Sequence, residues 1–127
     1  MNREKVIFAF FIVLALTLNF GFFLGEIDNP AHHNVFEFFA AIVVSMICTV
    51  LKFGDRTHIG ALMLATSLVA DMQLVVAAIM WGWAVQLSTA GLTPEVMSSV
   101  VSLSGGALLA NIVSVILLMV ETIVVRR

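Results

Sequence analysis

The sequence contains few charged residues. Asp, Glu, Lys and Arg make up 11% of its 127 residues, whereas an ordinary soluble domain has about a quarter. Hydrophobic residues make up 61% of the chain, and the stretches between the long apolar runs are too short to fold as a separate globular domain. This composition excludes a soluble enzyme domain, a nucleic-acid-binding domain and a disordered tail. It predicts an integral membrane protein.

The sequence also lacks the residues, or the placement of residues, that several classes of membrane protein require. The single cysteine, Cys48, cannot form an intramolecular disulfide, which excludes enzymes that use paired cysteines. The three histidines lie outside the apolar runs, which excludes haem ligation within the membrane. The last run has no arginine before Arg126, unlike a voltage sensor. No Gly-rich phosphate loop or Ser/His/Asp arrangement is present, so we expect no enzyme activity, no metal site and no cofactor.

The chain does contain four long apolar runs, at residues 6–24, 35–53, 59–87 and 94–125. An α-helix rises 1.5 Å per residue and the hydrocarbon core is about 30 Å thick, so about 20 residues cross it. The second run is the shortest and needs Phe53 or the stem of Lys52 to complete the crossing. Thr93, Pro94 and Glu95 are typical of a helix start. We predict an all-α bundle of four antiparallel transmembrane helices, with the whole chain as one domain.

The six basic residues all lie on one side of this topology. They are Arg3 and Lys5 before the first run, Lys52 and Arg56 between the second and third, and Arg126 and Arg127 at the end. The other two connections contain acids and no lysine or arginine. The positive-inside rule therefore predicts that both termini are cytoplasmic. We expect a multi-pass protein of the cell membrane, in the bacterial inner membrane. Its first helix should be retained, because no small-x-small cleavage site follows it.

Asp71 is the acid inside the third run. It lies 12 residues after Ile59, which at 1.5 Å per residue is about 18 Å, near the bilayer midplane. An ionisable side chain there costs on the order of 3 kcal/mol on insertion scales, and by default it marks an ion path, a proton relay or a counter-ion. The alternative is a hydrogen-bonded aspartate that joins two helices. The sequence leaves both interpretations open.

Each of the other runs has a polar side chain in its central zone. These are Asn19, Ser45 and Asn111, and Ser67 lies one turn before Asp71. The polar groups could line a path through the bundle, or they could satisfy one another as hydrogen bonds between helices.

Acids lie in both connections that the topology assigns to the outside. Glu26, Asp28 and Glu95 would concentrate cations at an outer mouth. Glu121, near the inner end of the last run, is either an acid at an inner mouth or an ion-pair partner of Arg126 or Lys52, and we favour the ion pair.

Two hypotheses about function follow. The first is passage of a small cation or proton along a path centred on Asp71, with the other central polar residues as oxygen ligands. The second is a non-catalytic accessory or assembly subunit of a larger membrane complex. The expected partners are the lipid bilayer and either further copies of this chain, as a homo-oligomer, or a larger membrane protein. Nucleic acid is not an expected partner.

Overall fold

The computed structural model describes residues 3–25, 34–55 and 57–125. Within them lie the helices α1 (Arg3–Phe23), α2 (Val35–Lys52), α3 (His58–Gln86) and α4 (Pro94–Val125). The predicted all-helical, four-helix architecture is confirmed, and every helix is long and apolar enough to cross a membrane. The observed limits differ from the predicted ones by three residues at the start of α1, and by one residue or none elsewhere.

Three helices begin at a side-chain cap. Asn34 accepts a hydrogen bond from a first-turn N–H of α2 at 2.7 Å. Thr57 does the same for α3 at 2.9 Å, and Thr93 for α4 at 3.2 Å. Each cap satisfies a backbone donor that the start of a helix leaves without an intrahelical partner. The caps therefore define where these helices begin, and Thr93 caps the helix start that the sequence predicts.

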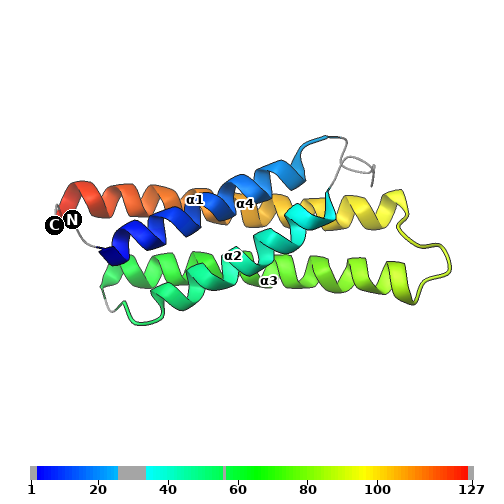
Figure 1. The fold of residues 1–127 in the computed structure, drawn as a ribbon, viewed down its shortest axis with the longest axis horizontal. Coiled ribbons are helices and arrows are strands. Elements are labelled where there is room, and N and C mark those ends of the chain that lie inside the picture. The colour runs from blue at the N-terminus through cyan, green and yellow to red at the C-terminus, as the bar shows by residue number, and fades with distance from the viewer. Residues whose placement is uncertain (1–2, 26–33, 56, 126–127) are drawn as a thin grey trace.

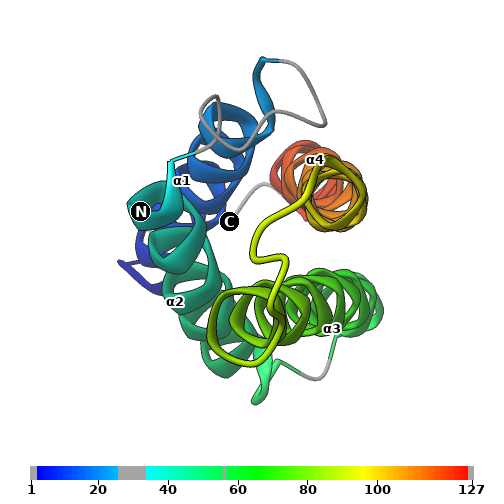
Figure 2. The same ribbon diagram turned by 90° about the vertical axis from the view of Figure 1, so that its right-hand side faces the viewer.

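The four helices form a ring. Seen along the bundle, α1 neighbours α2, α2 neighbours α3, α3 neighbours α4, and α4 neighbours α1 (Figure 2). The α3–α4 interface is the most extensive of the four, and the α2–α3 interface is the least. The start of α1, the end of α2, the start of α3 and the end of α4 lie toward one end of the long axis (Figure 1).

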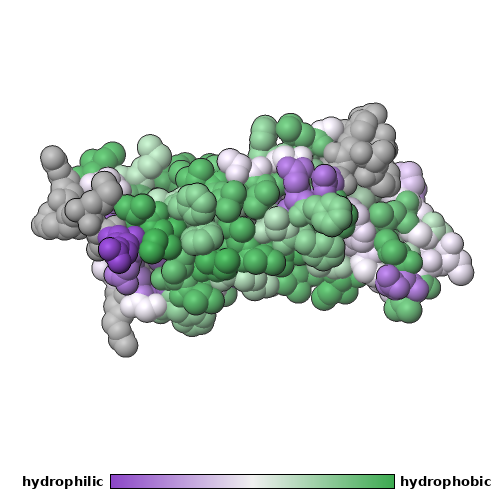
Figure 3. Space-filling view, viewed as in Figure 1, coloured by the Kyte–Doolittle hydropathy of each residue, from purple (hydrophilic) through white to green (hydrophobic). Residues whose placement is uncertain are grey.

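Several polar side chains lie inside the ring, and many large apolar side chains lie outside it. Apart from Lys52 and Glu121, the buried polar residues among those described are Asn19, Ser45, Thr49, Ser67, Asp71, Ser104, Asn111 and Ser114, which we call the central polar residues. Exposed Val, Ile, Leu, Phe and Met side chains occur along the helices, and hydrophobic surface covers most of the side of the bundle (Figure 3). A soluble bundle has the opposite distribution. Apolar surface of this extent is typical of contact with lipid or with another apolar surface.

Aromatic rings fill one end of the interior. The ring of Phe38 on α2 lies 4.8 Å from that of Phe22 on α1 and stacks on Trp81 of α3 at 5.4 Å. Both phenylalanines are fully buried. We call Phe22, Phe38 and Trp81 the aromatic end.

A second apolar cluster lies toward the opposite end and includes Phe8, Ile12, Met63 and Leu118. Its α2 members, Val44 and Cys48, are each followed directly by a central polar residue, Ser45 and Thr49 respectively.

Candidate functional site

Asp71 lies at the interface between α3 and α2. Its side chain is buried, with 8% exposed. Ser45 Oγ donates a hydrogen bond to Asp71 Oδ1 at 2.7 Å, and Thr49 Oγ1 donates to Oδ2. Ser45 and Thr49 are four residues apart on α2, so their side chains share one face of that helix. Two hydroxyls of α2 therefore hold both carboxylate oxygens across the least extensive interface of the ring.

Asp71 and Asn111 lie at matching depths. Asp71 is 13 residues from the first residue of α3, and Asn111 is 14 residues from the last residue of α4. These separations correspond to about 20 Å and about 21 Å along the helices. The two helix termini lie toward the same end of the bundle (Figure 1). Asn111 is 1% exposed and Ser67, one turn from Asp71 on α3, is 2% exposed. Both side chains therefore belong to the interior.

Further hydrogen bonds join α4 to its two neighbours. Ser104 Oγ donates to Asn19 Oδ1 at 3.5 Å between α4 and α1. The hydroxyls of Thr66 and Ser114 are hydrogen-bonded between α3 and α4. Of the predicted path residues, the structure thus joins Ser45 directly to Asp71, whereas Asn19 bonds a different partner.

Four buried polar atoms in the central zone have no hydrogen-bond partner among the described residues. They are Asn19 Nδ2, Ser67 Oγ, Gln73 Oε1 and Asn111 Nδ2. Buried polar atoms in proteins nearly always have a partner, which is either protein or water. Ser67 Oγ and Gln73 Oε1 are able to ligate a cation, whereas the two amide nitrogens can only donate hydrogen bonds. The central zone therefore offers binding capacity beyond the contacts that Asp71 makes.

Thr49 and Gln73 are central residues that the sequence analysis missed. The signal for Thr49 is the spacing of four residues after Ser45, which places two hydroxyls on one helical face. The predicted outer mouth has a different outcome. Glu95 is exposed in the first turn of α4, while Glu26 and Asp28 lie outside the described residues. The outer mouth stays a prediction.

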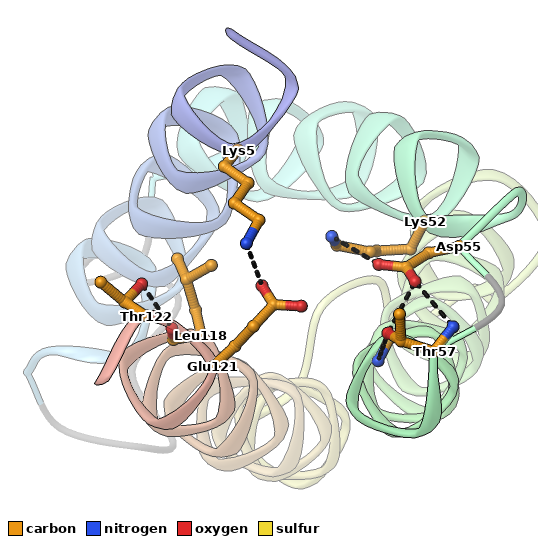
Figure 4. Close-up of polar contacts among 8 residues, drawn as sticks. Lys5, Lys52, Asp55, Thr57, Leu118, Glu121 and Thr122 are labelled. Atoms are coloured by element: carbon orange, nitrogen blue, oxygen red, sulfur yellow. Dashed lines mark hydrogen bonds and ion pairs between the residues drawn. The ribbon is translucent and has the colours of Figure 1, made fainter. Parts of the chain in front are cut away.

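Among the described residues, two ion pairs lie at the end of the bundle opposite the aromatic rings. Lys5 Nζ on α1 is 3.9 Å from Glu121 Oε1 on α4, and Lys52 Nζ on α2 is 3.3 Å from Asp55 Oδ2 (Figure 4). We call Lys5, Lys52, Asp55 and Glu121 the charged end. Lys52 is only 7% exposed, and its ammonium lies 4.3 Å from the centre of the Phe8 ring, a cation–π contact.

The partner of Glu121 differs from the expected one. The sequence predicts pairing with Arg126 or Lys52, but Glu121 lies beside Lys5, and Lys52 bonds Asp55. Arg126 lies outside the described residues. The difference arises because the ring of helices brings the start of α1 next to the end of α4, a proximity that local spacing does not reveal.

Asp55 connects the end of α2 to the start of α3. Partial burial raises the pKa of its carboxyl group, but hydrogen bonds from Thr57 and Lys52 outweigh burial and hold the pKa below its usual value. The Thr57 hydroxyl donates to Asp55 Oδ1 at 2.7 Å and the Thr57 N–H at 3.0 Å. The carboxylate also occupies the space that a Cβ atom at Gly60 would need. Asp55 is therefore an ionised partner for Lys52 at neutral pH.

The profile of a family of unknown function (DUF6394) matches residues 32–122 of the chain. The match covers more than half of the chain. The chain belongs to this family. The matched region includes Asp71 and both of its hydroxyl partners, Asn111, and three of the four residues of the charged end. No match was found among curated proteins or among solved structures.

Proposed function

We propose that the chain spans the cell membrane as an antiparallel four-helix bundle and passes a small cation or proton at Asp71. Four helices of membrane-spanning length and an apolar exterior support insertion. The positive-inside rule supports cytoplasmic termini, with the charged end on the cytoplasmic side. Copies of the chain packed side by side would form the homo-oligomer that we expect.

The observation that carries this proposal is the buried Asp71 carboxyl group, with a hydroxyl on each of its oxygens. An acid at this depth costs on the order of 3 kcal/mol, and hydrogen bonds between membrane helices contribute about 1 kcal/mol each. Two such bonds offset much of the cost but not all of it. A neutral amide would join α2 to α3 by hydrogen bonds as well. Packing alone therefore gives no reason for an ionisable group at this position.

The oxygen atoms of the Asp71 site are the groups that would bind a proton or a cation during passage. For a proton, the Asp71 carboxylate is the acceptor, and it releases the proton toward the opposite side. For a metal cation, the carboxylate supplies the charge, while the Ser45 and Thr49 hydroxyl oxygens keep lone pairs that are able to complete the ligand shell. In this proposal Glu95 attracts the cation at the outer side, together with Glu26 and Asp28. Ser67 is the next oxygen toward the cytoplasm.

The test is flux of protons and monovalent cations into liposomes that contain the purified protein. Asp71→Asn should abolish flux while the protein stays folded, because the amide neither carries charge nor accepts a proton near neutral pH. Asp71→Glu is the matched variant, since it keeps an ionisable carboxyl group, and it should retain part of the flux. Undiminished flux through Asp71→Asn would refute the assignment of Asp71.

A second candidate function is an accessory or assembly subunit of a larger membrane complex. The observation that favours it is that both Asp71 oxygens are already hydrogen-bonded within the chain, as expected of a residue that joins two helices. This function predicts no flux from either the wild type or Asp71→Asn when both are folded. It also predicts that a tagged chain, extracted in mild detergent, copurifies with a membrane protein.

A further inference from the structure

A cavity of about 460 Å³ lies at the charged end, between the start of α1 and the end of α2. Small-molecule sites in proteins are typically about 300–1,000 Å³, so its size suits a ligand group. Its charged lining consists of Glu4, Lys5, Lys52 and Asp55. Phe8 and Leu51 are among the apolar residues that complete the wall.

Among the described residues, the lining carries two ammonium groups and two carboxylates. Lys52 is more than nine-tenths buried, and its Nζ is positioned between the Asp55 carboxylate and the Phe8 ring. Lys5 reaches inward from α1 toward Glu121 (Figure 4). A purely anionic group in this cavity would meet the carboxylates as well as the lysines. A zwitterion complements both kinds of charge at once.

An apolar groove of about 390 Å³ runs along the outer face of α2 from the same end. Its walls are Ile42, Val43, Met46, Ile47, Val50 and Leu51. Leu51 also lines the charged cavity, so the two spaces adjoin. Val50 is 70% exposed, which leaves this face of α2 open to a ligand. A charged cavity that continues into an apolar groove matches the two parts of a phospholipid.

We propose that the charged end binds a zwitterionic aminophospholipid, with phosphatidylethanolamine as the committed occupant. The lysines bind the phosphate, and the Asp55 carboxylate accepts a hydrogen bond from the primary ammonium group. A quaternary ammonium headgroup has no N–H to donate. One acyl chain lies in the groove of α2. The proposal rests on membrane insertion of the bundle but not on cation passage.

The test is lipid retention by the delipidated full chain in detergent, measured by native mass spectrometry. The probes are phosphatidylethanolamine, phosphatidylglycerol and phosphatidylcholine with identical acyl chains. Phosphatidylethanolamine should be retained about fivefold better than either of the others, the ratio expected from one partly buried charge pair. The midpoint of thermal unfolding should rise most with the same lipid.

Two variants test the lining. Lys52→Met should lower the retention of all three lipids, because each of them carries the phosphate, whereas Asp55→Asn should remove the preference for phosphatidylethanolamine, because it removes the partner of the ammonium group. Arg3→Gln is the matched control, because Arg3 is an exposed cation in the first turn of α1 that does not line the cavity. It should keep the preference. Asp55→Asn alone decides the result if Lys52→Met does not fold, as judged by circular dichroism.

Three outcomes would overturn the proposal. They are tightest retention of phosphatidylglycerol, equal retention of all three lipids, and an equal rise in thermal stability with soluble glycerophosphoethanolamine, which has the headgroup without acyl chains.

Failure of the cation proposal gives a different result in the same experiment. Asp71→Asn should keep the full lipid preference whether or not it changes flux, because Asp71 is not part of the cavity wall.

Discussion

The two ends of the ring are held together by different interactions. At the aromatic end, fully buried rings from α1 and α2 pack on Trp81 of α3. At the charged end, two lysines pair with two carboxylates next to a cavity. Close packing of rings permits few alternative arrangements, whereas long charged side chains can change partners. The comparison predicts that the aromatic end contributes most to the stability of the bundle, while the charged end is the site at which we propose that a lipid binds.

Truncation of the aromatic end should have the largest effect on stability. Phe38→Ala should lower the free energy of unfolding by about 2 kcal/mol. This is less than the roughly 3–5 kcal/mol of a soluble core, because lipid is as apolar as the protein interior and only packing is lost. The measurement is unfolding by a denaturing detergent. Phe36→Ala is the matched control, since Phe36 lies two residues away and is 80% exposed. Equal losses in the two variants would contradict the comparison.

Removal of a central hydroxyl should have an intermediate effect. Thr49→Val keeps the shape of the side chain but removes the donor to Asp71, so the free energy of unfolding should fall by about 1 kcal/mol. A double-mutant cycle with Asp71→Ala, which removes the acceptor, measures the coupling between the two residues. Thr122→Val is the control, because the Thr122 hydroxyl bonds only a backbone carbonyl of its own helix among the described residues. Coupling near zero would show that the hydroxyl does not stabilise the α2–α3 interface.

The charged end should show the smallest effect, which appears as a dependence on pH. The pKa of Asp55 is lower in the folded chain than its unfolded value of about 3.9. The carboxylate therefore stabilises the fold above that value, and the contribution is lost as the pH falls through the folded pKa. The difference in unfolding free energy between the wild type and Asp55→Asn should be constant from pH 7 to pH 5 and should narrow below about pH 4. A difference that widens on acidification would reverse the assigned sign.

The fold could be predicted closely from the sequence because its signals are local. Apolar length gives the four helices, and the Thr93-Pro94-Glu95 start coincides with the observed start of α4. The depth of Asp71 follows from the number of residues between it and the start of its run, because the rise per residue in a helix is constant. The sequence predicts Ser45 as part of the path because of its central position, and in the structure Ser45 donates a hydrogen bond directly to Asp71.

The contacts between helices could be predicted only in part. Thr49 belongs to the Asp71 site because the rotation of α2 turns two hydroxyls toward α3. The sequence predicts that Lys52 lies at the membrane–water interface. In the structure its side chain is buried against Phe8, which precedes it by 44 residues in the sequence. Glu121 pairs with Lys5 for the same reason. Such partners depend on which helices are neighbours and on how each helix is rotated about its axis. Neither can be predicted from the spacing of residues within one helix.

The two helical hairpins have unequal lengths. At 1.5 Å per residue, α1 and α2, with 21 and 18 residues, are about 32 Å and 27 Å long, whereas α3 and α4, with 29 and 32 residues, are about 44 Å and 48 Å long. The longer pair extends beyond the shorter pair at the α3–α4 connection (Figure 1). A hydrocarbon layer of about 30 Å fits the first hairpin and is too thin for the second. In the membrane orientation that we propose, a tilt of the second hairpin relieves this hydrophobic mismatch, and bilayer thickness then acts on the α2–α3 interface, where Asp71 lies.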